Sequence, residues 1–130
     1  MGSVALILAL LLLGVSGPDR TPPVFAGIQS ATTCLGGPIG GDRPIHYQLA
    51  WDAAHDNKTP AARLVYDVYV GAREGARFAH LKWTSKPGAT SFRTPKLSSA
   101  KTYWFLVRAR DAAGNRDGNR HEAMGVNLCD

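Results

Sequence analysis

The chain has 130 residues, of which 45% are hydrophobic, and a formal net charge of +5. This length leaves room for a single domain, and the basic residues are scattered, which excludes a concentrated nucleic-acid-binding patch. The hydrophobic fraction is raised by an uncharged N-terminal segment in which Val4–Val15 is an unbroken apolar run of 12 residues.

The run Val4–Val15 is too short for a membrane span, which needs roughly 20 residues. It fits the apolar core of a secretory signal, with a cleavage site after the small residue Ser16. No Lys or Arg precedes the run, so an uncleaved membrane anchor is the alternative. We therefore expect a signal peptide at 1–16, a linker at 17–22 and a folded domain at 23–130 of a secreted or extracytoplasmic protein.

The chain contains two cysteines, Cys34 and Cys129. In an exported protein an isolated pair indicates a disulfide, and the spacing does not fit a zinc site. A Cys34–Cys129 bridge closes a loop of about 100 residues, which stabilises a domain by about 4–5 kcal/mol in the chain-entropy model.

Short strands separated by turn residues make up the rest of the chain. Leu35–Pro44, with four Gly and two Pro, reads as a loop, and no segment after the signal has helical periodicity. Alternating, β-branched and aromatic residues predict seven strands: 24–34, 45–53, 64–72, 78–84, 90–95, 103–109 and 122–129. An all-β, seven-stranded antiparallel sandwich follows.

Alternation also predicts which side chains are buried. On the sixth strand, Tyr103, Phe105 and Val107 are expected to face the core, where they join Trp51 and Tyr66 from earlier strands. This assignment leaves the even-numbered residues of the sixth strand on the solvent side.

Four features, in order, resemble a fibronectin type III domain over residues 22–129. These are the entry "TPP" at Thr21–Pro23, the inward Trp51, the strand "YDVYV", and Leu97 followed by Tyr103 at the start of an alternating strand. The resemblance implies an immunoglobulin-like sandwich and a Tyr103 hydroxyl that ties its strand to the preceding connection. The cysteine pair departs from the family, and a true immunoglobulin bridge would instead join the second and sixth strands.

A binding surface is expected on the outward side of the sixth strand. Trp104, Leu106 and Arg108 point outward there, beside Tyr69 of the third strand, and Trp83 is expected to join them. Aromatic and Arg side chains are enriched at protein interfaces. Cross-strand packing on a solvated sheet face is the simpler interpretation.

Four polar residues near two turns invite comparison with a calcium site: Asp56, Asp111, Asn115 and Asp117. Calcium prefers such oxygen ligands, but the EF-hand spacing and its closing Glu are missing. Asp, Asn and Gly are also ordinary turn residues, so the sequence favours turn chemistry, and we assign no metal or cofactor.

The sequence contains no catalytic motif such as G-x-S-x-G or H-E-x-x-H, and we do not expect an enzyme. We expect a monomeric extracytoplasmic binding or adhesion module for an unidentified protein or glycan. We expect no nucleic-acid partner, and membrane contact only through an uncleaved N-terminal segment. The alternatives are a secreted immunoglobulin-like protease inhibitor that acts through its loops, or a structural envelope spacer without a specific ligand.

Overall fold

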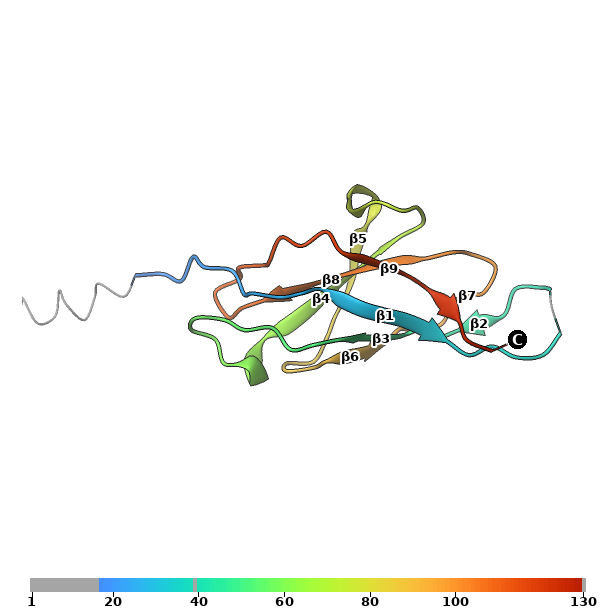
Figure 1. Cartoon of the computed structure of the whole chain (residues 1–130), viewed down its shortest axis with the longest axis horizontal. Helices are drawn as coiled ribbons and strands as arrows, with labels where there is room; N and C mark the ends of the chain where they lie inside the picture. Colours follow the sequence, from blue (N-terminus) through green and yellow to red (C-terminus); the bar gives the residue numbers. More distant parts are fainter. Residues whose placement is uncertain (1–16, 39, 130) are drawn as a thin grey trace, which may run out of the picture.

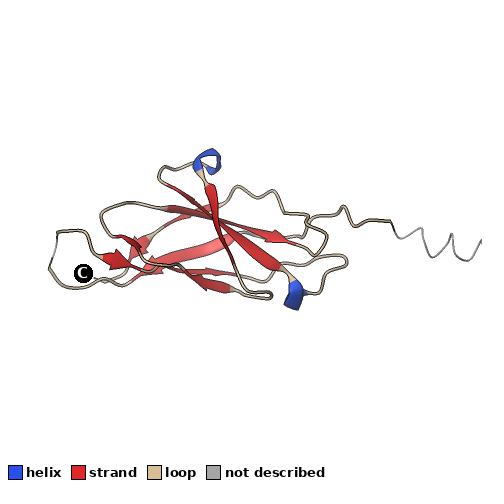
Figure 2. Cartoon of the chain, turned by 180° about the vertical axis from the view of Figure 1, so that it is seen from behind, coloured by secondary structure: helices blue, strands red, loops and turns tan. Residues whose placement is uncertain are grey.

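The computed structural model describes residues 17–38 and 40–129, so the expected signal peptide at 1–16 lies outside the described residues. In the described part the chain forms ten short strands and two single-turn 3-10 helices, η1 (Ala61–Arg63) and η2 (Ala76–Phe78) (Figure 2). The expected all-β class is confirmed. No helix in these ranges is long and apolar enough to cross a membrane.

One sheet has four strands, in the order β10 (Val126–Asn127), β1 (Ile28–Thr33), β3 (Gln48–Trp51) and β6 (Ser91–Arg93). β1 pairs antiparallel with β3, but β10 runs parallel to β1, with Thr32 opposite Val126. The expectation of a wholly antiparallel fold is therefore wrong at this edge. The chain leaves the other sheet at Gly125 and continues beside β1 in the same direction.

The other four-stranded sheet has the order β5 (His80–Thr84), β4 (Val65–Gly71), β8 (Trp104–Arg110) and β9 (Glu122–Met124). β4 and β8 pair along their full length, from Val65 opposite Arg110 to Gly71 opposite Trp104. Both strands are rich in β-branched and aromatic residues, which suits a pleated and largely buried surface.

The inward sides of the two sheets share one hydrophobic core. Trp51 and Tyr66, from different sheets, lie with ring centres 5.1 Å apart, and the predicted core residues Phe105 and Val107 are fully buried. Tyr103 is partly buried against the same cluster. For Phe105 and Val107, alternation in the sequence therefore predicted the inward side correctly.

A two-stranded sheet, β2 (Pro44–Ile45) with β7 (Leu97–Ser98), lies at one end of the molecule. The Tyr103 hydroxyl donates to the Ser98 carbonyl at 3.2 Å and accepts from the Ser98 N–H at 3.1 Å. It thereby ties β8 to the connection before it, as the resemblance implies, and Leu97 packs against the core.

The strand predicted at residues 45–53 is divided into β2 and β3. The Tyr47 N–H donates to Thr94 Oγ1, and the Thr94 N–H donates to the Tyr47 carbonyl. The chain therefore changes partner at Tyr47, from β7 to β6, and this change interrupts one long strand. The first predicted strand is likewise shorter, because Val24 bridges to His55 and regular pairing begins only at Ile28.

The two ends of the described chain lie at opposite poles (Figure 1). Cys34 follows β1 and Cys129 follows β10; the two form the predicted disulfide, with Cα atoms 4.8 Å apart and a sequence separation of 95 residues. Such a bond is typical of extracytoplasmic proteins. At the other pole, the linker at 17–22 meets the loops at 52–60 and 111–121.

Candidate functional site

The solvent side of the β5-β4-β8-β9 sheet, called the outer face below, carries most of the predicted binding residues. Tyr69 lies beside Leu106, and Trp104 lies beside Gly71, so both aromatic rings occupy this side of the sheet. The Arg108 guanidinium lies 5.4 Å from the centre of the Tyr69 ring, a cation–π arrangement. Trp104, Tyr69 and Arg108 are all partly exposed.

Two exposed apolar side chains extend the outer face at its edges. Leu81 of β5 pairs with Tyr69 and is 47% exposed, and Met124 of β9 pairs with Trp104 and is 49% exposed. A group of apolar and aromatic residues next to an Arg resembles the composition of protein interfaces. Neither residue was predicted from the sequence, because the position of each follows from strand register.

The prediction that Leu106 offers a contact surface is wrong, because only 1% of the residue is exposed. Its outward direction is as predicted. However, Tyr69 and Glu122 flank it on the neighbouring strands, and Trp104 and Arg108 flank it along β8. These longer side chains surround Leu106, so it supports its neighbours and does not meet a partner.

The prediction that Trp83 joins the outer face is also wrong. Trp83 packs against the core and stacks on Phe92 of the other sheet, with ring centres 5.8 Å apart. The cause is a bulge in β5: Trp83 pairs with Val68 and Leu81 pairs with Tyr69, so the pairing skips one residue. A one-residue shift exchanges the two sides of a strand, which turns Leu81 outward and Trp83 inward.

The loop between β4 and β5, residues 72–79, reaches from these strands to β9 at the opposite edge of the sheet. The Gly75 N–H donates to Glu122 Oε1 of β9 at 2.7 Å, which holds the loop against the far edge of the sheet. The guanidinium groups of Arg73 and Arg77 lie 4.0 and 4.7 Å from the centre of the Phe78 ring. These contacts place two positive charges on the loop between β4 and β5.

Asp67 occupies the outward side of β4 but is fully buried. It forms ion pairs with Arg110 (2.9 Å) and Arg116 (2.6 Å), and Thr84 Oγ1 donates to it at 2.7 Å. Burial acts to raise the pKa of Asp67, but the hydrogen bonds from Arg110, Arg116 and Thr84 outweigh it and hold the pKa below its ordinary value. This group joins β4, β5 and β8 and has a structural role.

Three carboxylates meet at the pole where the linker enters. Asp19, Asp56 and Asp111 each offer an oxygen, and these oxygens lie within 4.8 Å of one another. Asp56 and Asp111 belong to the predicted calcium set. Asp19 was missed because its segment was interpreted only as a linker.

The other two members of the predicted set have different roles. The Asn115 side chain donates to Asp111 Oδ2 and to the Asp19 carbonyl, both at 2.9 Å, and so connects two of the clustered residues. Asp117 Oδ1 accepts from the Ala109 N–H at 2.6 Å and its Oδ2 accepts from the Asn119 N–H at 2.9 Å. Asp117 thus stabilises the turn after β8 and lies outside the cluster.

Asp111 is buried and ionised at neutral pH. Burial acts to raise the pKa of its carboxyl group, but hydrogen bonds with the Asn115 side chain and backbone, the Asp19 side chain and the Ala113 N–H outweigh this effect. Its pKa therefore lies below the ordinary value. Asp111 accepts hydrogen bonds from N–H groups of its own turn, as expected from the sequence. It also lies close to the carboxylates of Asp19 and Asp56, which the turn itself does not need.

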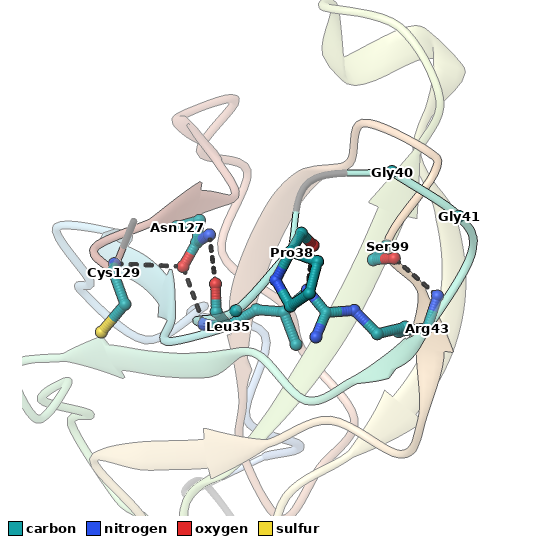
Figure 3. Close-up of a pocket in the computed structure, with 9 residues that line it drawn as sticks. Leu35, Pro38, Gly40, Gly41, Arg43, Ser99, Asn127 and Cys129 are labelled. Carbon is teal, nitrogen blue, oxygen red and sulfur yellow. Dashed lines mark hydrogen bonds between the residues drawn. The ribbon is translucent and has the colours of Figure 1, made fainter.

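A cavity of about 350 Å³ lies beside the disulfide (Figure 3). The polar side chains that line this cavity already form hydrogen bonds with other lining or neighbouring residues. Arg43 donates to the carbonyls of Gly36 and Pro38. The Asn127 side chain accepts from the Leu35 N–H and donates to the Leu35 carbonyl. These bonds hold the glycine-rich loop in place and leave few free groups for a ligand.

No family model, curated protein or solved structure matches the chain. A family assignment therefore depends on the residues and contacts described above. The two candidate features are the outer face and the carboxylate cluster, and they lie on different parts of the domain.

Proposed function

We propose that the chain is an exported, non-catalytic binding domain of the fibronectin type III kind. Apart from the two-residue strands β2, β7 and β10, seven strands remain, divided between two sheets that share a core. The chain crosses repeatedly from one sheet to the other, as in β-sandwiches with Greek-key connections. The bond from the Tyr103 hydroxyl to Ser98 supports the same assignment.

The outer face is the proposed contact surface for a protein or glycan partner. The observation that carries this proposal is the presence of Leu81 and Met124, each about half exposed, on the same side of one sheet as Tyr69 and Trp104. Exposed apolar groups scattered singly are ordinary, whereas several apolar and aromatic groups on one side of the same sheet, together with Arg108, favour binding. Rigid rings on a sheet also lose little side-chain entropy when they meet a partner.

The proposal is tested by binding of the purified domain to extracellular proteins and to a glycan array. Trp104→Ala and Leu81→Glu are expected to weaken binding by about tenfold or more, since central aromatic contacts often contribute 2 kcal/mol or more. Val126→Glu, at a similarly exposed apolar residue on the other sheet, is the matched control and should bind normally.

Binding that survives both outer-face substitutions contradicts the proposal. Inhibition of a protease that is lost on changes in the loop at 35–44 would favour the inhibitor alternative. A domain that binds nothing under native conditions would favour the structural spacer.

A further inference from the structure

A second cavity, of about 290 Å³, lies on the solvent side of the β10-β1-β3-β6 sheet. It is lined by a row of three polar residues from adjacent strands: Thr32 of β1 pairs with Gln48 of β3, and Gln48 pairs with Arg93 of β6. Residues paired in this way point to the same side of a sheet, with Cβ atoms about 5 Å apart. Their chain neighbours Ala31 and Leu49 are buried, so the row faces the solvent, on the opposite side of the sandwich from the outer face.

His46 adds an imidazole to the same cavity in a fixed orientation. It lies one residue before the point at Tyr47 where the chain changes partner, and its Nδ1 lies 2.7 Å from the Thr94 carbonyl oxygen. A carbonyl oxygen can only accept a hydrogen bond, so Nδ1 carries the hydrogen and Nε2 is the nitrogen that a ligand can reach. The interruption between β2 and β3 therefore places an oriented imidazole beside the row of polar residues.

The polar side chains of the row form no hydrogen bond with any other described residue. Arg93 also takes part in none of the ion pairs of the described residues, all of which involve Asp67. Near the start of β1, by contrast, Gln29 donates to Asp52 at 2.7 Å. The row therefore presents donors and acceptors together, in one cavity, that only water or a ligand can satisfy.

The chemistry of the lining indicates what kind of ligand the cavity takes. The lining residues carry one guanidinium, one imidazole, one amide and two hydroxyl groups, and none of the described lining residues is acidic. A planar guanidinium binds a carboxylate through two parallel N–H···O bonds. Amide and hydroxyl groups both donate and accept, which suits the hydroxyls of a sugar.

The size and the apolar part of the lining favour one sugar residue. The cavity lies at the lower end of the range of small-molecule sites, about 300–1,000 Å³, which is small for a peptide segment. Leu128, which is 69% exposed, lines it and offers an apolar surface to the C–H side of a sugar ring.

We propose that this cavity binds the carboxylate-bearing sugar residue of an acidic glycan, of the uronic acid type. Arg93 binds the carboxylate, and Gln48 and Thr32 bind ring hydroxyls. His46 Nε2 accepts from a further hydroxyl. Because the cavity lies on the other sheet, this site does not depend on the proposed function of the outer face, and it gives the domain a second, independent contact.

The site is tested by NMR titration of the isotope-labelled full chain with sodium glucuronate at constant ionic strength. The amide signals of Thr32, Gln48 and Arg93 should shift saturably, with a Kd of about 1 mM for so small a ligand. The amide signals of Tyr69 and Trp104 on the outer face should not shift. Glucose, which lacks the carboxylate, and acetate, which lacks the hydroxyls, should each bind at least about tenfold more weakly.

Variants of the row identify the groups that bind. Arg93→Gln should weaken glucuronate binding by about tenfold or more, since it removes the charge-assisted bonds. Arg93→Lys keeps the charge but loses the paired bonds and should weaken binding severalfold, as should Thr32→Val, which removes one hydroxyl. Arg63→Gln, at an exposed arginine of η1, is the matched control and should bind normally. The amide spectrum of each variant shows whether it is folded.

Several results would overturn the proposal. The absence of saturable shifts in the row, or binding that is unchanged in Arg93→Gln, would overturn the site. Equal affinity for glucose would overturn the role of the carboxylate, and equal affinity for acetate would mean an adventitious anion only. Equal affinity for the tripeptide Gly-Asp-Gly would favour a protein partner and overturn the choice of a sugar.

One further variant separates this cavity from the outer face. Trp104→Ala should bind glucuronate normally, and loss of binding in that variant would place the sugar on the outer face instead. Binding to acidic glycans that Arg93→Gln loses and Trp104→Ala retains belongs to this cavity and leaves the test of the outer face unaffected.

Discussion

Replacement of Asp67 by Asn tests whether the buried carboxylate stabilises the β5-β4-β8-β9 sheet by linking its strands. The change keeps the shape of the side chain but removes the charge that two guanidinium groups and the Thr84 hydroxyl contact. Loss of one partner from a buried ion pair costs about 3–5 kcal/mol. The side chains of Arg110 and Arg116 are 31% and 42% exposed and regain water, so we expect a loss of about 2–3 kcal/mol.

The assay is thermal and urea unfolding between pH 7 and pH 3, with Asp52→Asn as the exposed control. At pH 7 the melting temperature of Asp67→Asn should fall by about 8–12 °C, and that of the control should hardly change. Because the pKa of Asp67 is lowered by folding from an ordinary value of 3.8, its contribution is complete above that value and disappears as pH falls through the lower pKa of the folded state. The difference between the wild-type chain and the variant should therefore shrink below about pH 4.

Two results would refute this reasoning about Asp67. A loss below about 0.5 kcal/mol at pH 7 would mean that the carboxylate contributes no more than an ordinary surface charge. A loss that is the same at pH 7 and pH 3 would mean that shape, and not ionisation, determines the effect.

Three further changes test other contacts of the fold by urea unfolding. Tyr103→Phe removes the hydroxyl that bonds Ser98 and should cost about 1–2 kcal/mol; no loss would contradict a role for that bond. Gly125→Ala places a Cβ 2.5 Å from the Tyr47 ring and should cost about 1–3 kcal/mol, whereas a neutral result would mean that the crossing between the sheets is loosely packed. Cys34→Ser opens the disulfide and should cost about 3–5 kcal/mol, as should reduction of the wild-type chain; a variant as stable as the oxidised chain would show that the bond is dispensable.

Periodicity in the sequence predicted most of the interior. Alternation identified Phe105 and Val107 as buried and Trp104 as outward, because successive side chains of a strand must point to opposite sides. The chain positions of Cys34 and Cys129 predicted the disulfide, since both follow strands that end at the same pole.

The details of the surface depend on contacts that periodicity does not contain. Alternation shows that Leu106 points outward, but not that longer neighbours surround it. The bulge that exchanges Leu81 and Trp83 arises from pairing with β4 and has no Gly or Pro to mark it.

The cluster of carboxylates was only half predicted for a similar reason. Asp56 and Asp111 lie in turns that a seven-stranded fold brings to one pole. Asp19 lies in a short linker that is far from both in sequence, and its position depends on the course of the chain after folding. A search for acidic residues in every segment near that pole, the linker included, could have identified it.

The central claim is that the outer face is the surface through which the domain meets a partner, and site-specific photocrosslinking in the native compartment tests it most directly. Photoreactive residues placed in turn at Leu81 and Met124 should capture the same molecule, and a photoreactive residue at Val126 should not capture it. After purification, the captured molecule should bind the wild-type domain but not the Trp104→Ala variant. Capture only from Val126, or from all three positions equally, would contradict the claim.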